Sequence, residues 1–223
     1  NIKLVQIQHH YAHILSVMAE NRLDKEVLGF AFDGTGYGDD GNIWGGEVLI
    51  TSRKDYKRIK HIKYFRLLGG EMAVKEPKRV ALSLLFETFS LEEILILDIP
   101  TVKAFKETEI KMLYTIWQKG LNAPLCSSIG RLFDAISSFA DILHTQTYEG
   151  ETGLQIEQNY DSSITSSYSY EINENEIDLR LMIKELIKEN DKNLICSKFI
   201  NTIVNLILEI SNSYKNLPVV LSG

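Results

Sequence analysis

The hydrophobic pattern changes character twice along the chain, and this constrains the fold more than any other feature. Short apolar runs typical of β-strands dominate the first 70 residues, and helical spacing dominates from there to Leu143. Further helices then lead back to a strand-like run at 217–221. Strands that enclose a helical stretch and then recur are typical of architectures in which a sheet and helices share a core. The sequence therefore predicts an α/β fold with a helical insertion.

The spacing of apolar residues predicts the individual elements. Helices are expected over 9–21, 72–89, 91–97, 102–118, 128–143, 151–158, 177–188 and 194–213. Strands are expected at 1–8, 27–32, 44–50, 56–65 and 217–221, with weaker alternation over 162–172. We expect the strands at 44–50 and 56–65 to be antiparallel neighbours. Because strand-like runs lie at both ends of the chain, we expect a piece excised from a longer protein.

Composition excludes several classes of protein. The 223 residues are 44% hydrophobic and 24% charged, which is typical of globular proteins and not of collagen-like or disordered ones. A net charge of −6 argues against a non-specific nucleic-acid binder. Cys126 and Cys196 cannot form a disulfide framework and lie in no C-x-x-C pair, so we expect buried thiols in a reducing compartment. We find no apolar run of about 18 residues and no signal peptide, and expect a cytoplasmic protein that contacts no membrane.

Three of the five histidines fall within residues 9–13. His9 and His13 are four residues apart, so on a helix they share one face, while His10 points about 100° away. Two imidazoles suit zinc or iron and need further ligands, for which a carboxylate is the usual choice. Asp33 is the natural third ligand because it follows the strand at 27–32. An ordinary pair of surface or core histidines remains the alternative.

Four glycines follow Asp33 within eight residues. We expect Gly34, Thr35 and Gly36 to begin a tight loop whose backbone N–H groups can face a phosphate. The alternative is a plain glycine-rich hairpin. The spacing fits neither a P-loop nor an EF-hand.

A helix is predicted to open at Gly130, with Arg131 and Asp134 three residues apart. The Asp134 carboxylate could accept hydrogen bonds from two ribose hydroxyls, and Arg131 could bind a phosphate or pair with Asp134. The alternative is a surface ion pair. Glu76-Pro77 is predicted to begin another helix, since proline suits a first helical turn.

Several strings, in this order and spacing, resemble the C-terminal carbamoyltransferase module of the HypF family of [NiFe]-hydrogenase maturation proteins. They are His9-His10-Tyr11-Ala12-His13, Asp33-Gly34-Thr35-Gly36-Tyr37-Gly38, Trp44-Gly45-Gly46-Glu47, Glu76-Pro77-Lys78-Arg79, Gly130-Arg131-Leu132-Phe133-Asp134-Ala135, Tyr148-Glu149-Gly150 and Leu221-Ser222-Gly223. The resemblance implies an actin-like ATPase fold (ASKHA, ribonuclease H-like) related to the tRNA threonylcarbamoyl-transferases.

The resemblance also implies an activity. In the family, carbamoyl phosphate and ATP yield carbamoyl adenylate, and the carbamoyl group passes to the thiol of the C-terminal cysteine of the partner HypE. The product is the precursor of the cyanide ligands of the hydrogenase iron. The implied cofactors are a divalent metal, iron or zinc, and ATP or AMP.

Residue roles follow from the resemblance. It implies that the metal ligands are His9, His13 and Asp33. It implies that the nucleotide contacts are Asp134 at the ribose, Gly150 and Glu151 in the matching turn, and Gly223 at the phosphates. The expected parts are a strand-rich 1–70, a helical 71–145, and a second nucleotide-binding part at 146–223. The family motif continues beyond Gly223 to a further metal-binding aspartate, so we expect these residues alone to be inactive.

Two other functions stay open. The first is an ATP-dependent small-molecule kinase of the same superfamily, for which Asp33-Gly34-Thr35 would grip phosphate; the histidine pair has no role there. The second is a non-catalytic docking domain, which would expose apolar surface on the helices between 177 and 213.

Overall fold

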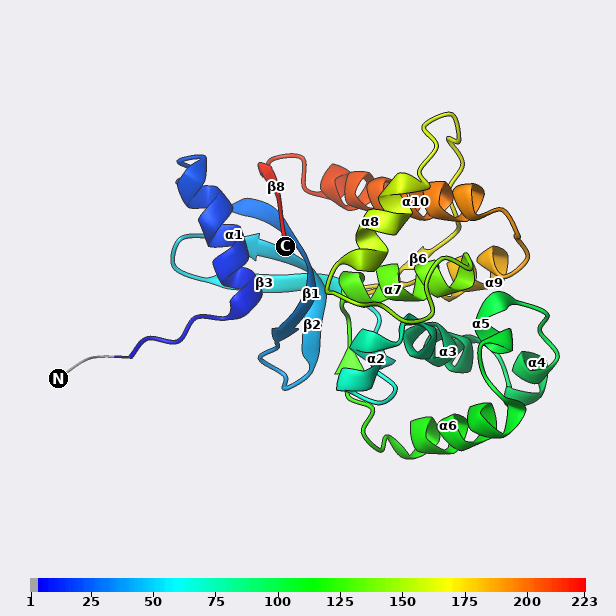
Figure 1. Cartoon of the computed structure of the whole chain (residues 1–223). Coiled ribbons are helices and arrows are strands. Elements are labelled where there is room, and N and C mark those ends of the chain that lie inside the picture. The colour runs from blue at the N-terminus through cyan, green and yellow to red at the C-terminus, as the bar shows by residue number, and fades with distance from the viewer. Residues whose placement is uncertain (1–3) are drawn as a thin grey trace.

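The computed structural model describes residues 4–223, and a mixed sheet lies at its centre with helices on both faces (Figure 1). The strands are β1 (Val27–Tyr37), β2 (Ile43–Thr51), β3 (Tyr56–Ile62), β4 (Phe65–Arg66), β5 (Leu125–Cys126), β6 (Glu171–Ile172), β7 (Glu176–Asp178) and β8 (Val219–Ser222). The helices are α1 (His9–Glu20), α2 (Glu71–Lys75), α3 (Pro77–Thr88), α4 (Leu91–Leu95), α5 (Pro100–Lys103), α6 (Glu107–Lys119), α7 (Ile129–Phe139), α8 (Glu151–Gln158), α9 (Arg180–Leu186) and α10 (Lys192–Ser213).

Strand β1 pairs with β2, which follows it directly in the chain, and with β8, which lies at the C-terminal end. On one side it is antiparallel to β2, and on the other it is parallel to β8. Strand β3 pairs antiparallel with β2, as predicted, and β7 pairs parallel with β3. Because β7 and β8 come from the last third of the chain, the first and last parts build one sheet together.

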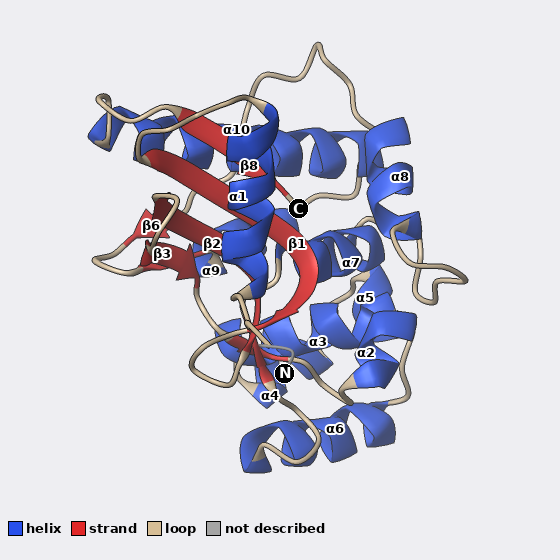
Figure 2. Ribbon diagram, turned by 90° about the vertical axis from the view of Figure 1, so that its left-hand side faces the viewer, coloured by secondary structure: helices blue, strands red, loops and turns tan. Residues whose placement is uncertain are grey.

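The two faces of the sheet pack against different helices. Val27, Ala31 and Leu49 lie in one apolar cluster with Ile14 and Met18 of α1. The alternate residues of the same strands, such as Leu28, Phe30 and Val48, belong to the larger core that α3, α7 and α10 complete. This alternation follows from the two-residue period of a strand. Figure 1 shows α1 and α7 on opposite sides of the strands, and Figure 2 shows α1 crossing β1 and β8.

Proline and glycine divide the helical part more finely than apolar spacing predicts. The expected helix at 72–89 is interrupted at Glu76, and α3 begins at Pro77 as the Glu76-Pro77 pair predicts. The expected helix at 102–118 is two helices, α5 and α6. Helix α6 ends at Lys119, and the next residue, Gly120, caps it with a left-handed φ of 63°, which favours glycine.

Four expectations for the other segments are wrong. Residues 4–8 form no strand, and Leu4, Val5 and Ile7 are exposed; positions 1–3 lie outside the described residues. The loop expected from Asp33 is shorter, since β1 continues to Tyr37. Residues 162–170 form no strand, and the helix expected at 177–188 is β7 followed by α9. The extension of β1 and the formation of β7 both follow from pairing with strands elsewhere in the chain, which local apolar spacing does not record.

Helix α10 corrects the expectation about apolar stretches. By length and composition alone it could cross a membrane, and it is the one such helix among the described residues. The core helix of a globular domain passes the same test, and α10 buries Phe199 and Leu206 completely. The Phe199 ring meets Phe133 of α7 edge to face, with 4.9 Å between centroids. In this fold α10 therefore serves as a core helix.

Candidate functional site

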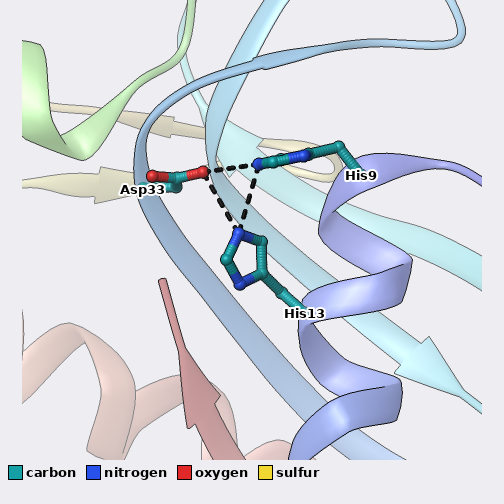
Figure 3. Close-up of side chains that lie close together, drawn as sticks. All are labelled: His9, His13 and Asp33. Carbon is teal, nitrogen blue, oxygen red and sulfur yellow. Dashed lines mark hydrogen bonds and ion pairs between the residues drawn. The ribbon is translucent and has the colours of Figure 1, made fainter.

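The side chains of His9, His13 and Asp33 converge at the start of α1 (Figure 3). The Gln8 side chain caps the helix by accepting from the Tyr11 N–H at 2.8 Å, so helical geometry begins at His9 and stacks His13 one turn later. Asp33 Oδ2 lies 2.8 Å from His9 Nε2 and 3.3 Å from His13 Nε2. The two Nε2 atoms are 3.2 Å apart. The structure thus brings the three predicted ligands to one point.

This triangle suits a single cation. Ligand atoms bound at about 2.0–2.2 Å in a tetrahedral zinc site are about 3.3–3.6 Å apart, so the three observed spacings need to widen by less than about 1 Å each. Two imidazole nitrogens with one carboxylate are ligands that zinc and iron both accept. Three protein ligands leave a position for a substrate atom. The donor set and its spacing therefore fit the implied metal.

An irregularity in β1 aims the Asp33 side chain. The pairing with β2 shifts between Phe32 and Gly36, which is a β-bulge, and bulges re-aim side chains. One carboxylate oxygen accepts from the Gly34 N–H at 2.6 Å while the other faces the histidines. Partial burial raises the pKa of Asp33, but the hydrogen bonds from His9 and the Gly34 N–H outweigh it and hold the pKa below its ordinary value. Asp33 is therefore an anion ready to bind a cation.

His10 points away from the triad, as its position on the helix predicts. Its side chain is fully buried, and burial lowers its pKa to about 4. The rings of His9 and His10 press on Gly36, where an added Cβ would lie 2.4 Å from a carbon of His10. The absence of a side chain at Gly36 thus leaves room for the two imidazole rings.

A cavity of about 430 Å³ opens on the other side of the same bulge. Its walls come from β1, the first half of α7, the turn before α8, and the end of β8. They are Phe32, Asp33, Gly34, Ile129, Gly130, Arg131, Phe133, Asp134, Glu149, Gly150, Thr152, Gly153 and Gly223. Asp33 belongs to both features, so the triad and the cavity meet at this residue.

Arg131 and Asp134 form a buried pair in the cavity wall, which excludes the surface alternative. Arg131 Nη1 lies 2.8 Å from Asp134 Oδ2, and the Thr152 hydroxyl donates to Oδ1 at 2.8 Å. The Arg131 contact is close but poorly aligned, so Oδ2, Nη1 and Nε have no hydrogen-bond partner among the described residues. Burial raises the pKa of Asp134 to about 6, against the opposing effects of Arg131 and Thr152. Unpaired buried polar atoms in a cavity wall are suited to a polar ligand.

The other predicted contact residues divide into two sets. Gly34, Gly150 and Gly223 line the cavity. Gly150 has a left-handed φ of 84° and precedes α8, a conformation that favours glycine. Thr35, Gly36 and Glu151 do not line it. Thr35 is exposed on β1, and the Glu151 carboxylate accepts from the Thr147 N–H and hydroxyl, closing its own turn.

Sequence reasoning missed residues that act from beneath the site. Glu47 is a fully buried carboxylate, and Ser128 a fully buried hydroxyl at the start of α7. Thr152 and Glu149 reach the cavity from the segment around Gly150. A signal for Glu47 existed, since an acidic residue in an apolar strand needs buried partners. No such signal existed for Ser128, because its local sequence does not distinguish it from the other serines of the chain.

The cysteines are buried, as predicted. Cys126 and Cys196 are both fully buried free thiols, and burial raises the pKa of each to about 12. A thiolate is therefore disfavoured at both positions, and neither is suited to act as a nucleophile.

Comparison with known proteins places the chain in a family. The model of the carbamoyltransferase Kae1-like domain, second subdomain, matches residues 29–223. The chain is 39% identical to the carbamoyltransferase HypF of Synechocystis sp., covering 97% of this chain and 31% of the relative. It is 36% identical to the probable carbamoyltransferase HypF of Methanocaldococcus jannaschii over 70% of this chain and 20% of the relative. The chain thus spans about a third or less of the length of these relatives.

Solved structures agree with the sequence comparison. A crystal structure of full-length HypF in the phosphate- and nucleotide-bound form superposes with a TM-score of 0.87 at 35% identity, covering 98% of this chain and 30% of that one. The crystal structure of T.kodakarensis HypF superposes with a TM-score of 0.85 at 30% identity, covering 100% of this chain and 31% of that one. The fold is therefore of the Kae1-like, actin-like ATPase type, as the resemblance implied. The chain belongs to the HypF carbamoyltransferase family.

Proposed function

We propose that this chain binds a nucleotide and a divalent metal and supports transfer of a carbamoyl group within a HypF-family carbamoyltransferase. The donor would be carbamoyl adenylate, made from carbamoyl phosphate and ATP by the whole protein. The acceptor would be the C-terminal cysteine thiol of HypE, and the product the precursor of the cyanide ligands of the [NiFe] site. A reducing cytoplasm is the compartment that suits a free thiol acceptor.

One observation carries the proposal: Asp33 joins a metal-binding triad to a cavity lined by the buried charged pair Arg131 and Asp134. Oδ2 of Asp33 faces the two histidines, while its residue lines the same wall as Arg131 and Asp134. A HypF relative of the same fold binds phosphate and nucleotide. A nucleotide in this cavity would place its phosphates toward the triad if its ribose lay at Asp134.

The residues of the chain would act mainly by positioning and electrostatics. Both residues line the cavity, where the Asp134 carboxylate can accept from a ribose hydroxyl and the Arg131 guanidinium beside it can donate to phosphate oxygens. A bound divalent metal would supply a Lewis acid that polarises an oxygen of the activated carbamoyl group. Because a carbamoyl adenylate is already activated, the site needs chiefly to orient the acyl carbon and exclude water.

The kinase alternative is disfavoured by where Asp33 points. Its carboxylate oxygens contact His9, His13 and the Gly34 N–H, and the following Thr35 is exposed. A phosphate-gripping Asp-Gly-Thr would instead direct its side chains at the phosphate. No observation favours the kinase over carbamoyl transfer.

The test uses the intact protein that carries this chain. We expect Asp134→Asn to raise the Kd for AMP about 10-fold or more in calorimetry, because an amide accepts a ribose hydroxyl less strongly than a carboxylate does. We expect a His9→Ala, His13→Ala double variant to lose metal in elemental analysis and to abolish carbamoylation of HypE, followed by mass spectrometry of its C-terminal cysteine.

His61→Ala is the matched control, since His61 is a half-buried histidine of β3 outside the triad. It should keep metal, AMP affinity and HypE carbamoylation. Equal metal content in the double variant and the control would refute the ligand assignment. An unchanged Kd for AMP in Asp134→Asn would refute the ribose contact.

A further inference from the structure

The β-bulge at Asp33 leaves part of β1 without a partner strand. The register passes from Phe32 opposite Gly46 to Gly36 opposite Trp44, so four steps along β1 match two along β2. Residues 33–35 consequently have no partner residue on β2. The carbonyls of Asp33 and Gly34, two half-buried residues, need another donor, because a carbonyl that is withdrawn from water and left unpaired is costly.

Ser128 supplies that donor from another element. Its hydroxyl oxygen lies 2.8 Å from the carbonyl oxygens of both Asp33 and Gly34, and it shares its proton between them. The same oxygen accepts from the Arg131 N–H at 3.2 Å and so caps α7. One fully buried hydroxyl thus ties the bulge that bears the metal ligand to the helix that bears Arg131 and Asp134.

Glu47 holds the segment that contains Ser128. One of its oxygens accepts from the hydroxyl of Ser127 at 2.5 Å and from the Gly45 N–H at 3.1 Å. The other accepts from Arg58 Nε at 2.5 Å, which neutralises the buried charge. The carboxylate therefore fixes the strand before α7 against β2.

The junction leaves little room for adjustment. An added Cβ at Gly130 would lie 2.7 Å from Gly34 Cα, so the start of α7 rests directly on the bulge. A shift of α7 must therefore move Asp33 and Gly34 with it, since close-packed backbones transmit displacement.

We propose that Ser128 is a positioning residue that sets the metal-binding carboxylate of Asp33 and the cavity wall in one geometry, with Glu47 anchoring the segment that carries it. The inference rests on the proposed function, because it assigns a role toward the metal and nucleotide proposed there. Ser128 itself contacts neither ligand. Its effect passes through the Asp33 and Gly34 carbonyls.

The test compares two helix-capping serines in the intact protein, with Co²⁺ as the metal probe. Ser128→Ala should raise the Kd for Co²⁺ about 10-fold, as loss of groups that orient metal ligands does, and should change the visible absorption of bound Co²⁺. It should also raise the Kd for AMP. Ser128→Thr keeps the hydroxyl and should restore both affinities and the spectrum.

Ser90→Ala is the matched control. Ser90 caps α4 in a capping box remote from the junction, so its loss costs a cap without touching the site. It should leave the spectrum and both Kd values unchanged. If Ser128→Ala leaves the cobalt spectrum and both Kd values as in Ser90→Ala, while His9→Ala removes cobalt, the positioning role is wrong and the proposed metal site stands. If His9→Ala also keeps cobalt, the metal site itself is wrong.

Ser127→Ala keeps the inference testable should Ser128→Ala fail to fold. It leaves the α7 cap intact and removes only the hydroxyl that donates to Glu47. We expect a smaller rise in the Kd for Co²⁺, about 3-fold, in the same direction. An unchanged Kd and spectrum in this variant would overturn the anchoring role of Glu47.

Discussion

The two halves of the candidate site differ in how deeply their charged groups are buried. The triad is partly open to solvent, with side-chain exposures of 47% for His9, 30% for His13 and 22% for Asp33. The pair in the cavity wall is enclosed, with 6% for Arg131 and 2% for Asp134. Both halves are attached to the bulge in β1, so the same strand positions them. Their surroundings differ, because the triad lies near solvent and the pair is buried.

Because of this difference in burial, we expect the triad and the buried pair to contribute differently to metal binding and to the stability of the fold. The triad ligands stand on α1 and β1, whose packing is made by Ile14, Met18 and Ala31, so the ligands contribute little to the core. Arg131 and Asp134 lie within α7, which buries most of its residues. We therefore expect changes at the triad to alter metal affinity and changes at the pair to alter stability as well.

Arg131→Met should show the largest effect on folding. Removing one partner of a buried ion pair leaves the other charge uncompensated, and the expected loss is about 3–4 kcal/mol in the free energy of unfolding. Urea titration followed by circular dichroism measures it. Adding Asp134→Asn should recover part of the loss, because the unpaired charge is then removed. A double variant less stable than Arg131→Met would contradict the comparison.

A pH effect of about 3 kcal/mol is expected from Asp134. Burial raises its folded-state pKa from 3.8 to about 6. Between these values the folded state holds a proton that the unfolded state has released, so stability falls as pH rises from about 4 to 6 and stays lower above it. The unfolding free energy of the wild type should fall relative to that of Asp134→Asn over this window. If the difference in unfolding free energy between wild type and Asp134→Asn stayed constant from pH 4 to 7, this expectation would be wrong.

Asp33→Ala should have a small effect on folding, which would sharpen the contrast between the triad and the buried pair. Without added metal we expect a change of about 1 kcal/mol or less in unfolding free energy, since the carboxylate is partly exposed. With Co²⁺ the same variant should lose at least about 100-fold in metal affinity, because one of three ligands is gone. Chemical denaturation and cobalt titration give the two values. A loss of stability as large as that of Arg131→Met would remove the distinction.

Leu208→Gln should have the smallest effect. Leu208 and Val204 are half-exposed one turn apart on α10, away from its buried face. A surface substitution there should change the unfolding free energy by about 0.5 kcal/mol at most and leave the Kd for AMP unchanged. If the variant instead lost HypE carbamoylation while keeping AMP and metal, the docking alternative would gain support for this face.

Much of the fold could be predicted from periodicity because its signals are local. The helix at α8 and the core of α10 agree with apolar spacing, and Pro77 begins α3. The short strands β5 and β7 could not be found this way, since two or three residues give no period, and β6 is only the last two residues of the alternation predicted over 162–172. Their pairing depends on partners far away in the chain.

The sequence by itself determined the α/β class and the residue types that can bind a metal, because helical spacing places His9 and His13 on one face whatever surrounds them. Tertiary structure alone decided that Asp33 faces them while Thr35 and Glu151 turn elsewhere. The bulge, the Ser128 hydroxyl and the burial of Arg131 with Asp134 all arise where β1, β2 and α7 meet. Contacts between segments about a hundred residues apart along the chain leave no pattern in either one, so no local reading of sequence could supply them.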